Sequence, residues 1–149
     1  MSAMVIVGGG HAAGQNAASL RQEGYDGEII IIGDDTHIPY QRPPLSKQYL
    51  SGEHGLERVY LRPEKFYEER NIELRLGVTV TKINPDEHTV ITSTGDTVSY
   101  EKLLLATGSR PRILNAPGSD LPGIHYLRAV DHVDNIQAEI PQVNNVCIV

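Results

Sequence analysis

A glycine-rich turn near the start of the chain has the residue types and the spacing that hold a diphosphate. A short apolar run leads directly into Gly8, Gly10 and Ala13, in the pattern Gly-x-Gly-x-x-Ala. Gly8 allows a tight bend, Gly10 lets a pyrophosphate approach the backbone, and the small Ala13 lets a helix pack closely on a strand. The N-terminus of that helix then offers free N–H groups and a partial positive charge to the phosphates.

Two carboxylates, Asp34 and Asp35, follow the next apolar run, about twenty residues beyond the turn. A carboxylate at this position can accept hydrogen bonds from ribose hydroxyls and would repel the 2′-phosphate of NADP. Either side chain could instead cap backbone amides in a turn. Glycines between a strand and a helix, with an acid at the end of the next strand, together indicate a site for an adenine dinucleotide.

These residues need a βαβ unit to position them. An alanine-rich helix over residues 11–22 would place Ala13, Ala17 and Leu20 on one face, as a helix pressed against a sheet requires. Residues 29–32 form an unbroken β-branched run, which is typical of a central parallel strand buried on both faces. The sequence therefore predicts an α/β fold with a parallel sheet.

A small antiparallel β-meander is expected in place of the ordinary helical crossover. Residues 78–83 and 89–92 alternate in polarity around a turn and predict a hairpin, to which residues 97–100 add a strand. The other expected elements are a stiff segment with a short helix that starts at Pro43-Pro44 and carries Lys47, a polar stretch over 51–62, a helix at 63–70, a strand at 73–76, a buried strand at 103–106, a short strand at 124–127, a helix at 130–140 and a strand from 146.

Composition narrows the functional classes. The formal net charge of −6 argues against non-specific nucleic-acid binding. The one cysteine, Cys147, is expected to be a small core residue, and the sequence has neither a disulfide framework nor a Cys-x-x-Cys pair. The histidines do not pair at metal-ligand spacing, no Gly-x-Ser-x-Gly elbow supports a hydrolase, and no apolar run reaches the roughly 20 residues of a membrane span. We therefore expect no metal site, no membrane span and a cytoplasmic location.

Three segments, in the expected order and over nearly the whole chain, resemble the N-terminal part of the FAD-dependent pyridine-nucleotide oxidoreductases. They are Val5-Ile6-Val7-Gly8-x-Gly10, Pro39-Tyr40-Gln41-Arg42-Pro43-Pro44-Leu45-Ser46-Lys47 and Leu104-Leu105-Ala106-Thr107-Gly108-Ser109-Arg110-Pro111. The first and third are shared widely among two-dinucleotide flavoproteins. The middle segment is specific to the ferredoxin, putidaredoxin and rubredoxin reductase branch, which the sequence most resembles, and whose near relatives include apoptosis-inducing factors and monodehydroascorbate reductases.

The resemblance implies a Rossmann-like FAD-binding domain and a role for each matching residue. The turn Gly8, Gly10, His11, Ala12, Ala13 would hold the FAD pyrophosphate, with the Ala12 backbone closest to it and His11 exposed rather than catalytic. The remaining implied FAD contacts are Asp34 or Asp35 on the ribose, Arg42 near the phosphates, the adjacent Pro43, Lys47 at the isoalloxazine ring, Val80 at the adenine end, Ala106, Thr107 and Gly108 near the flavin, and Arg128 from the later segment.

Lys47 is the residue with a catalytic role in this scheme. A flavin that accepts hydride gains negative charge near N1 and N5, so a nearby ammonium group favours the reduced state and raises its potential. A charge-assisted hydrogen bond of this kind contributes roughly 1.5–3 kcal/mol. The alternative is a solvent-facing lysine on the short helix of a surface loop.

The resemblance also implies the activity of the parent protein. FAD would take hydride from NAD(P)H and deliver electrons to a ferredoxin-like iron–sulfur protein or a rubredoxin, while the missing Cys-x-x-Cys pair counts against a disulfide reductase. Residues 1–113 would be the first segment of the FAD domain, and residues 114–149 a connection and the start of a truncated NAD(P)-binding domain, so the fragment itself is expected to be inactive. Two alternatives stay open: a flavoprotein like apoptosis-inducing factor or monodehydroascorbate reductase, and a plain NAD-binding dehydrogenase domain.

Overall fold

The computed structural model describes residues 3–149, which divide into two compact units. The first unit comprises the chain up to Gln41 together with Tyr60–Gly108. The second comprises Arg42–Val59 together with Ser109–Val149. The glycine-rich turn and both candidate ribose carboxylates belong to the first unit.

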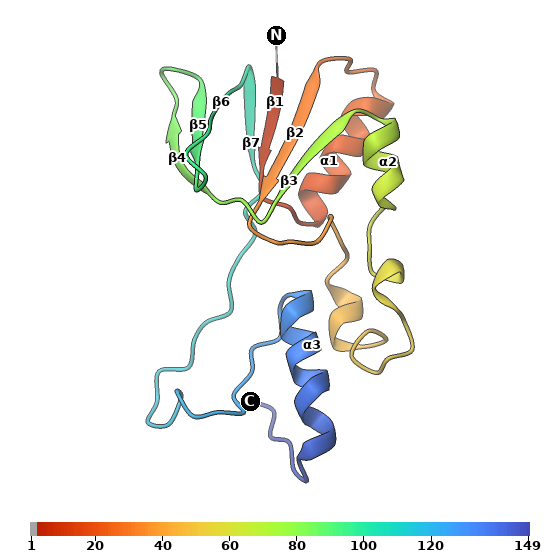
Figure 1. The fold of residues 1–149 in the computed structure, drawn as a ribbon, viewed down its shortest axis with the longest axis vertical. Helices are drawn as coiled ribbons and strands as arrows, with labels where there is room; N and C mark the ends of the chain where they lie inside the picture. Colours follow the sequence, from red (N-terminus) through yellow and green to blue (C-terminus); the bar gives the residue numbers. More distant parts are fainter. Residues whose placement is uncertain (1–2) are drawn as a thin grey trace. The chain divides into compact units, whose positions relative to one another are not determined.

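A parallel sheet with strand order β3-β2-β1-β7 forms the centre of the first unit (Figure 1). Its strands are β1 (Ala3–Val7), β2 (Glu28–Gly33), β3 (Ile72–Leu76) and β7 (Lys102–Leu105). In the register of β1, Val5 lies opposite Ile30 on one side and opposite Leu103 on the other. Because all the pairings are parallel, the carboxyl ends share one edge, and the glycine turn and the two aspartates leave the sheet from that edge.

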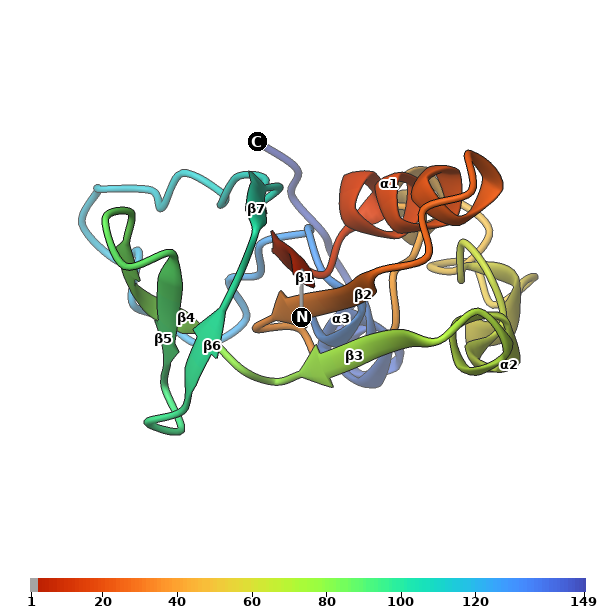
Figure 2. The same ribbon diagram turned by 90° about the horizontal axis from the view of Figure 1, so that it is seen from above.

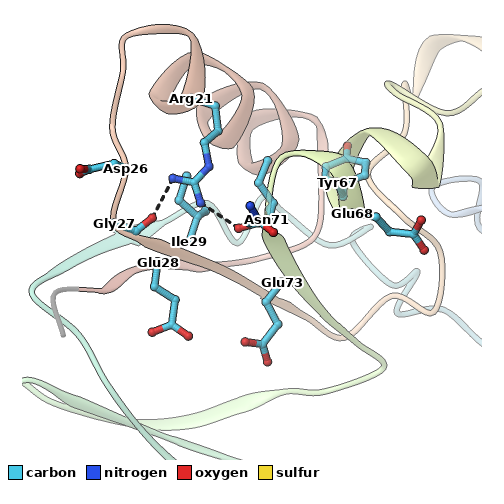
Figure 3. Close-up of a pocket in the computed structure, with 10 residues that line it drawn as sticks. Arg21, Asp26, Gly27, Glu28, Ile29, Tyr67, Glu68, Asn71 and Glu73 are labelled. Atoms are coloured by element: carbon cyan, nitrogen blue, oxygen red, sulfur yellow. Dashed lines mark hydrogen bonds between the residues drawn. The ribbon is translucent and has the colours of Figure 1, made fainter.

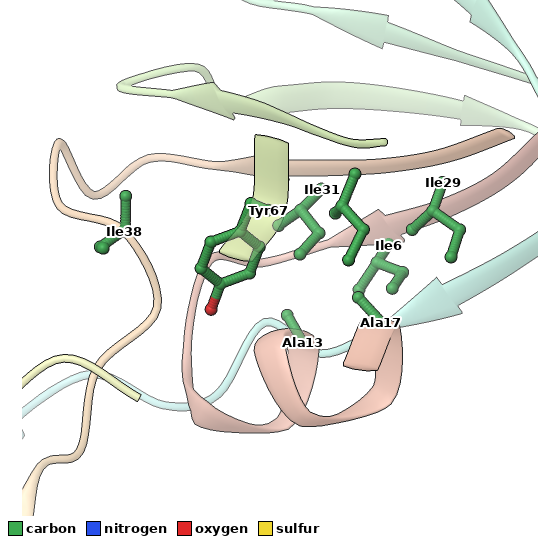
Figure 4. Close-up of a cluster of buried hydrophobic side chains, with 8 residues drawn as sticks. Ile6, Ala13, Ala17, Ile29, Ile31, Ile38 and Tyr67 are labelled. Carbon is green, nitrogen blue, oxygen red and sulfur yellow. The ribbon is translucent and has the colours of Figure 1, made fainter. Parts of the chain in front are cut away.

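Helices α1 (His11–Gln22) and α2 (Glu64–Glu69) pack on one face of this sheet (Figure 2). Ala13 and Ala17 of α1 are fully buried against the isoleucines of β1 and β2, as the helical spacing predicted (Figure 4). The small side chains let α1 approach the strands, while Tyr67 of α2 fills the space beside them. The buried members of this core are Ile6, Ala13, Ala17, Ile29, Ile31, Ile38, Tyr67 and Ile72.

The opposite face carries the predicted antiparallel meander, and its hairpin is confirmed. Strands β4 (Val80–Asn84), β5 (Thr89–Thr92) and β6 (Thr97–Ser99) form a separate sheet in that order (Figure 2). Alternate residues of β1 and β2 meet Val90 and Val98 of this sheet in a second core. Residues of β2 are therefore buried on both faces, as the unbroken isoleucine run predicted.

The amino ends of the strands are tied together by one arginine of α1. The Arg21 guanidinium donates hydrogen bonds to four backbone carbonyl oxygens, those of Tyr25, Gly27, Arg70 and Asn71, at 2.7–2.8 Å. Figure 3 shows two of these bonds, to Gly27 and Asn71, among the residues that line a hollow of about 440 Å³. They join the end of α1, the start of β2 and the turn between α2 and β3 on the side of the sheet away from the glycine turn.

The second unit contains η1 (Pro43–Ser46), η2 (Leu56–Arg58), α3 (Val130–Glu139) and η3 (Ile140–Gln142). Side chains from distant parts of the sequence hold it together. The Gln137 amide of α3 donates to the carbonyl oxygens of Tyr49 (2.7 Å) and Leu50 (3.3 Å), and the Tyr49 hydroxyl donates to Asp134 (2.7 Å). Val130 and Val133 provide the buried face of α3.

Five of the expectations were wrong. The strand predicted at 103–106 as buried is the edge strand β7, in which Leu105 is 58% exposed, because only β1 pairs with it in the described chain. Residues 124–127 and 146–149 form no strand in the described chain, since an apolar run needs the hydrogen bonds of a neighbouring strand to adopt one. Cys147 is consequently exposed rather than part of a core. Lys47 follows the short η1 instead of lying in it, with φ −133° and ψ −111°.

No helix between residues 3 and 149 has the length and apolar character needed to cross a membrane. The same part of the chain contains no group of three or more His, Cys, Asp or Glu residues that could hold a metal ion.

Candidate dinucleotide-binding site

The first glycine of the turn is required by close backbone packing. Gly8 has φ +113°, and a Cβ placed on it would lie 2.6 Å from the carbonyl carbon of Ala106. Its N–H donates to the carbonyl of Ile32 (2.7 Å), and the Ala106 N–H donates to the carbonyl of Val7 (2.7 Å). The turn is therefore held between the ends of β2 and β7 by backbone alone, and Ala106 lies beside it.

Two further glycines, which the sequence analysis did not single out, bring the turn against the end of β2. A Cβ on Gly33 would lie 2.5 Å from the Gly9 nitrogen and 2.7 Å from the Gly9 Cα. Both residues are buried. The signal in the sequence was the run of three glycines and the single glycine that follows the isoleucine run.

Gly10 and the start of α1 have the features that a diphosphate needs. A Cβ on Gly10 would meet nothing within 4 Å, so the backbone is open at this position. Gly10 is the N-cap residue of α1 and has no side chain to cap it, and the first turn of the helix contains no acid. The N–H groups of His11, Ala12 and Ala13 precede the first intrahelical bond, which Gly14 makes to Gly10 (3.1 Å). An anion here would find N–H donors, a favourable helix dipole and room to approach.

The requirement for small residues extends one position beyond the predicted pattern. Ala13 is fully buried against the sheet, which agrees with its place in the third slot. Gly14, which the sequence analysis missed, is also buried, and a Cβ on it would lie 2.6 Å from the Cβ of Pro39 and 3.0 Å from the Tyr67 hydroxyl. Burial raises the pKa of Tyr67 to about 12, while the nearby Arg62 charge acts in the opposite direction, so the phenol is neutral at ordinary pH. His11 and Ala12 are exposed, as expected for residues that would offer only backbone N–H groups.

The two aspartates after β2 have different surroundings. One oxygen of the Asp35 carboxylate accepts the His37 N–H (3.1 Å), and the other accepts the Tyr40 hydroxyl (2.7 Å). The Asp35 carbonyl also accepts the N–H of Gly77, after β3 (2.9 Å). Asp34 is exposed. Asp35 thus holds the local turn together, while the Asp34 carboxylate faces solvent.

The other residues predicted from the first unit occupy strand ends or loops. Val80 is half-buried on β4, beside a register shift in the β4–β5 pairing. Ala106 is half-buried, whereas Thr107 and Gly108 are exposed, and Gly108 has φ +68°. Since Ala106 contacts Gly8, the segment 106–108 leaves the sheet next to the glycine turn.

Four predicted residues belong to the second unit, which brings two of them together. The Arg42 side chain, half-buried, donates from Nη1 to the backbone carbonyl of Arg128 (2.5 Å). Pro43 and Lys47 are exposed at the two ends of η1, and the Lys47 N–H donates to the Pro44 carbonyl (3.0 Å). The sequence alone did not indicate that Arg42 and Arg128, 86 positions apart, make this contact.

Known proteins match this chain over nearly all of its length. A family model described as pyridine nucleotide-disulphide oxidoreductase matches residues 2–149. A ferredoxin–NAD(P)(+) reductase of Sphingomonas sp. is 42% identical over 146 residues, covering 98% of this chain and 35% of the relative. A rubredoxin–NAD(+) reductase of Pseudomonas putida is 40% identical over 147 residues, covering 98% of this chain and 38% of the relative.

A solved structure agrees with these matches. The ferredoxin reductase for the CYP199A2 system from Rhodopseudomonas palustris superposes with a TM-score of 0.90 at 39% identity, covering 95% of this chain and 35% of that one. The chain therefore spans little more than a third of the proteins it matches. The resemblance predicted from the three sequence segments is confirmed: this chain belongs to the pyridine nucleotide-disulphide oxidoreductase family.

Proposed function

We propose that this chain forms the FAD-binding part of an NAD(P)H-dependent reductase that passes electrons to a ferredoxin-like iron–sulfur protein or a rubredoxin. The observation that carries the proposal is the open, uncapped start of α1 at Gly10, set by close backbone contacts between the turn and the ends of β2 and β7. The names of the matched relatives supply the acceptor class. We further propose that residues 1–113 belong to the FAD domain, that residues 114–149 lead toward a nicotinamide-binding domain, and that the protein works in the cytoplasm.

We assign the adenosine ribose to Asp34. Both oxygens of the Asp35 carboxylate already accept hydrogen bonds from His37 and Tyr40, whereas the Asp34 carboxylate is exposed at the same strand end. A ribose diol donates two hydrogen bonds most readily to a carboxylate whose oxygens remain accessible. Asp35 then acts indirectly, by fixing the turn that follows.

The other proposed FAD contacts come from both side chains and backbone groups. Bound FAD would exchange hydride with a nicotinamide and single electrons with an iron centre. The first-turn amides of α1 would bind its diphosphate, and the Arg42 guanidinium would add charge there while Nη1 remains on the Arg128 carbonyl. The exposed Lys47 ammonium would stabilise negative charge on the reduced ring. Val80, His11, Ala12, Pro43, Thr107 and Gly108 would contribute backbone contacts.

Two measurements on the full-length protein test the proposal. The natively purified protein should be yellow with one FAD per chain, and it should reduce a ferredoxin or rubredoxin when supplied with NADH or NADPH. A colourless protein that binds no added FAD would refute the cofactor assignment. Reduction of ferricyanide without any reduction of an iron–sulfur protein or rubredoxin would refute the acceptor class alone.

Residue assignments are tested by matched pairs of variants. Asp34→Asn should weaken FAD binding about tenfold, since a charge-assisted hydrogen bond contributes roughly 1.5–3 kcal/mol, with little change in unfolding. The opposite ranking of Asp34→Asn and Asp35→Asn in FAD affinity would reassign the ribose. Lys47→Ala should lower the flavin reduction potential, and an unchanged potential would remove its electrostatic role.

A further inference from the structure

The outer surface of the helix layer in the first unit contains a basic cleft between α1 and α2, which we call the α1–α2 cleft. It has a volume of about 370 Å³ and is lined by Ala18, Arg21, Gln22, Arg62, Phe66 and Arg70. Three of these residues are arginines and none is acidic, although the chain as a whole has a formal net charge of −6. The volume is near the lower end of the range for small-molecule sites, roughly 300–1,000 Å³.

Two of the arginines are ordered by one aromatic ring. The Arg62 Cζ lies 5.5 Å from the centroid of Phe66, and the Arg70 Cζ lies 5.9 Å from it. Cation–π contact of this kind holds each guanidinium in place, so less side-chain freedom is lost when a ligand binds. Both guanidinium groups line the same cleft, so an anion bound there would be attracted by two positive charges.

The third arginine supplies charge but few free donors. Four N–H···O bonds to backbone carbonyl oxygens already occupy the Arg21 guanidinium, and Figure 3 shows two of them, to Gly27 and Asn71. Arg62 makes one short bond, from Nη1 to the Leu61 carbonyl (2.9 Å), and a long one of 3.5 Å to Gln15. The side chains able to bind a ligand directly are therefore Arg62, Arg70 and the exposed Gln22 amide.

We propose that the α1–α2 cleft binds a small molecule that carries a phosphate group. Guanidinium groups bind phosphate oxygens through paired N–H donors, and two such groups with an amide suit a dianion better than a single carboxylate. The Phe66 ring and the Ala18 methyl provide apolar contact for the rest of the ligand. This site is distinct from the proposed dinucleotide site, because the α1 residues that line it are positions 18, 21 and 22 rather than the first turn.

The test is a calorimetric titration of the full-length protein with inorganic phosphate at low ionic strength. Saturating FAD and NAD⁺ keep phosphate out of the dinucleotide sites. Arg70→Gln and Arg62→Gln should each weaken phosphate binding about tenfold, and the double variant should abolish it. Lys65→Gln is the matched control, since it removes one positive charge from α2, between Arg62 and Arg70, at a residue that does not line the cleft and pairs with Glu69.

The FAD content and thermal midpoint of each variant establish that it is folded. Should Arg62→Gln fail to fold, the exposed Arg70 carries the test through Arg70→Gln. Absence of phosphate binding by the wild-type protein, or equal affinity in wild type and Arg70→Gln, overturns the proposal. Binding of an acidic peptide in the absence of phosphate binding also overturns it, because the cleft would then recognise a macromolecule.

Discussion

The glycine turn of the first unit and the Arg42–Lys47 segment of the second are both predicted to bind the same cofactor, but they are built in different ways. The turn is positioned by backbone against backbone, through missing Cβ atoms at Gly8 and Gly33. The segment is positioned by side chains that reach backbone 86–88 positions away, from Arg42 to Arg128 and from Gln137 to Tyr49. Where backbone packs against backbone, even one added methyl group must displace the chain. Where side-chain hydrogen bonds hold a segment, each substitution removes only the bonds of that one side chain.

The largest effect should come from adding a single methyl group to the turn. In Gly8→Ala, the new methyl group would overlap the Ala106 carbonyl, and alanine would also have to adopt the positive φ of Gly8. We therefore expect the free energy of unfolding to fall by at least about 3 kcal/mol and the protein to retain no FAD. Gly24→Ala is the matched control: Gly24 has φ +84° but nothing within 4 Å, so only the backbone cost of about 1 kcal/mol remains. Urea unfolding and the visible spectrum measure both. Equal losses in the two variants would show that contact with Ala106 is unimportant.

Removal of the Asp35 side chain should have the second-largest effect on stability, because its carboxylate holds the turn after β2 by hydrogen bonds. Asp35→Ala leaves the His37 N–H and the buried Tyr40 hydroxyl without their carboxylate partner, at a cost of about 2–3 kcal/mol. Asp34→Ala should change the free energy of unfolding by less than about 0.5 kcal/mol, because Asp34 is exposed. Urea unfolding of the cofactor-free protein separates them. Similar values for the two variants would contradict the division of roles between the aspartates.

The tethers of the second unit should have smaller individual effects. Gln137→Ala removes donors to two carbonyl oxygens and should cost about 1–2 kcal/mol. Gln142→Ala removes an exposed local bond to Ala138 and should cost less than about 0.5 kcal/mol. Hydrogen exchange of the amides in residues 42–51 and in α3 gives the location of the change. Unaltered exchange in residues 42–51 would show that Gln137 does not hold this segment.

The same contrast explains how much the sequence could predict. The Gly8–Ala13 turn, α1 and the isoleucine strand depend on local spacing, and the predicted bounds of α1 agree with the structure. The contact between Arg42 and Arg128 depends on a fold that no local pattern encodes. Strand formation also depends on hydrogen bonds to a neighbouring strand. The apolar character of residues 124–127 and 146–149 predicts strands, but these residues form none in the described chain because no neighbouring strand pairs with them. The need for glycine at position 14 cannot be predicted from local spacing, because it comes from contact with Pro39 and Tyr67, which lie on other elements.

The smallest effect should come from the hydroxyl that lies against Gly14. Tyr67 is 1% exposed and its hydroxyl has no hydrogen-bond partner in the structure, so Tyr67→Phe should leave stability unchanged at pH 7 or raise it by up to about 1 kcal/mol. Burial raises the pKa of Tyr67 from 10.0 to about 12, so the folded state holds this proton more tightly than the unfolded state. The stability that the protonated Tyr67 gives the folded state is fully present below pH 10 and is lost as the pH rises toward 12. Tyr67→Phe has no ionisable hydroxyl and should therefore lose less stability over this pH range than the wild-type protein. Urea unfolding at pH 7 and pH 11 measures both effects. If Tyr67→Phe were less stable than the wild-type protein at pH 7, the hydroxyl would have to make a favourable hydrogen bond. A side-chain hydrogen bond would then help to hold the packing around Gly14.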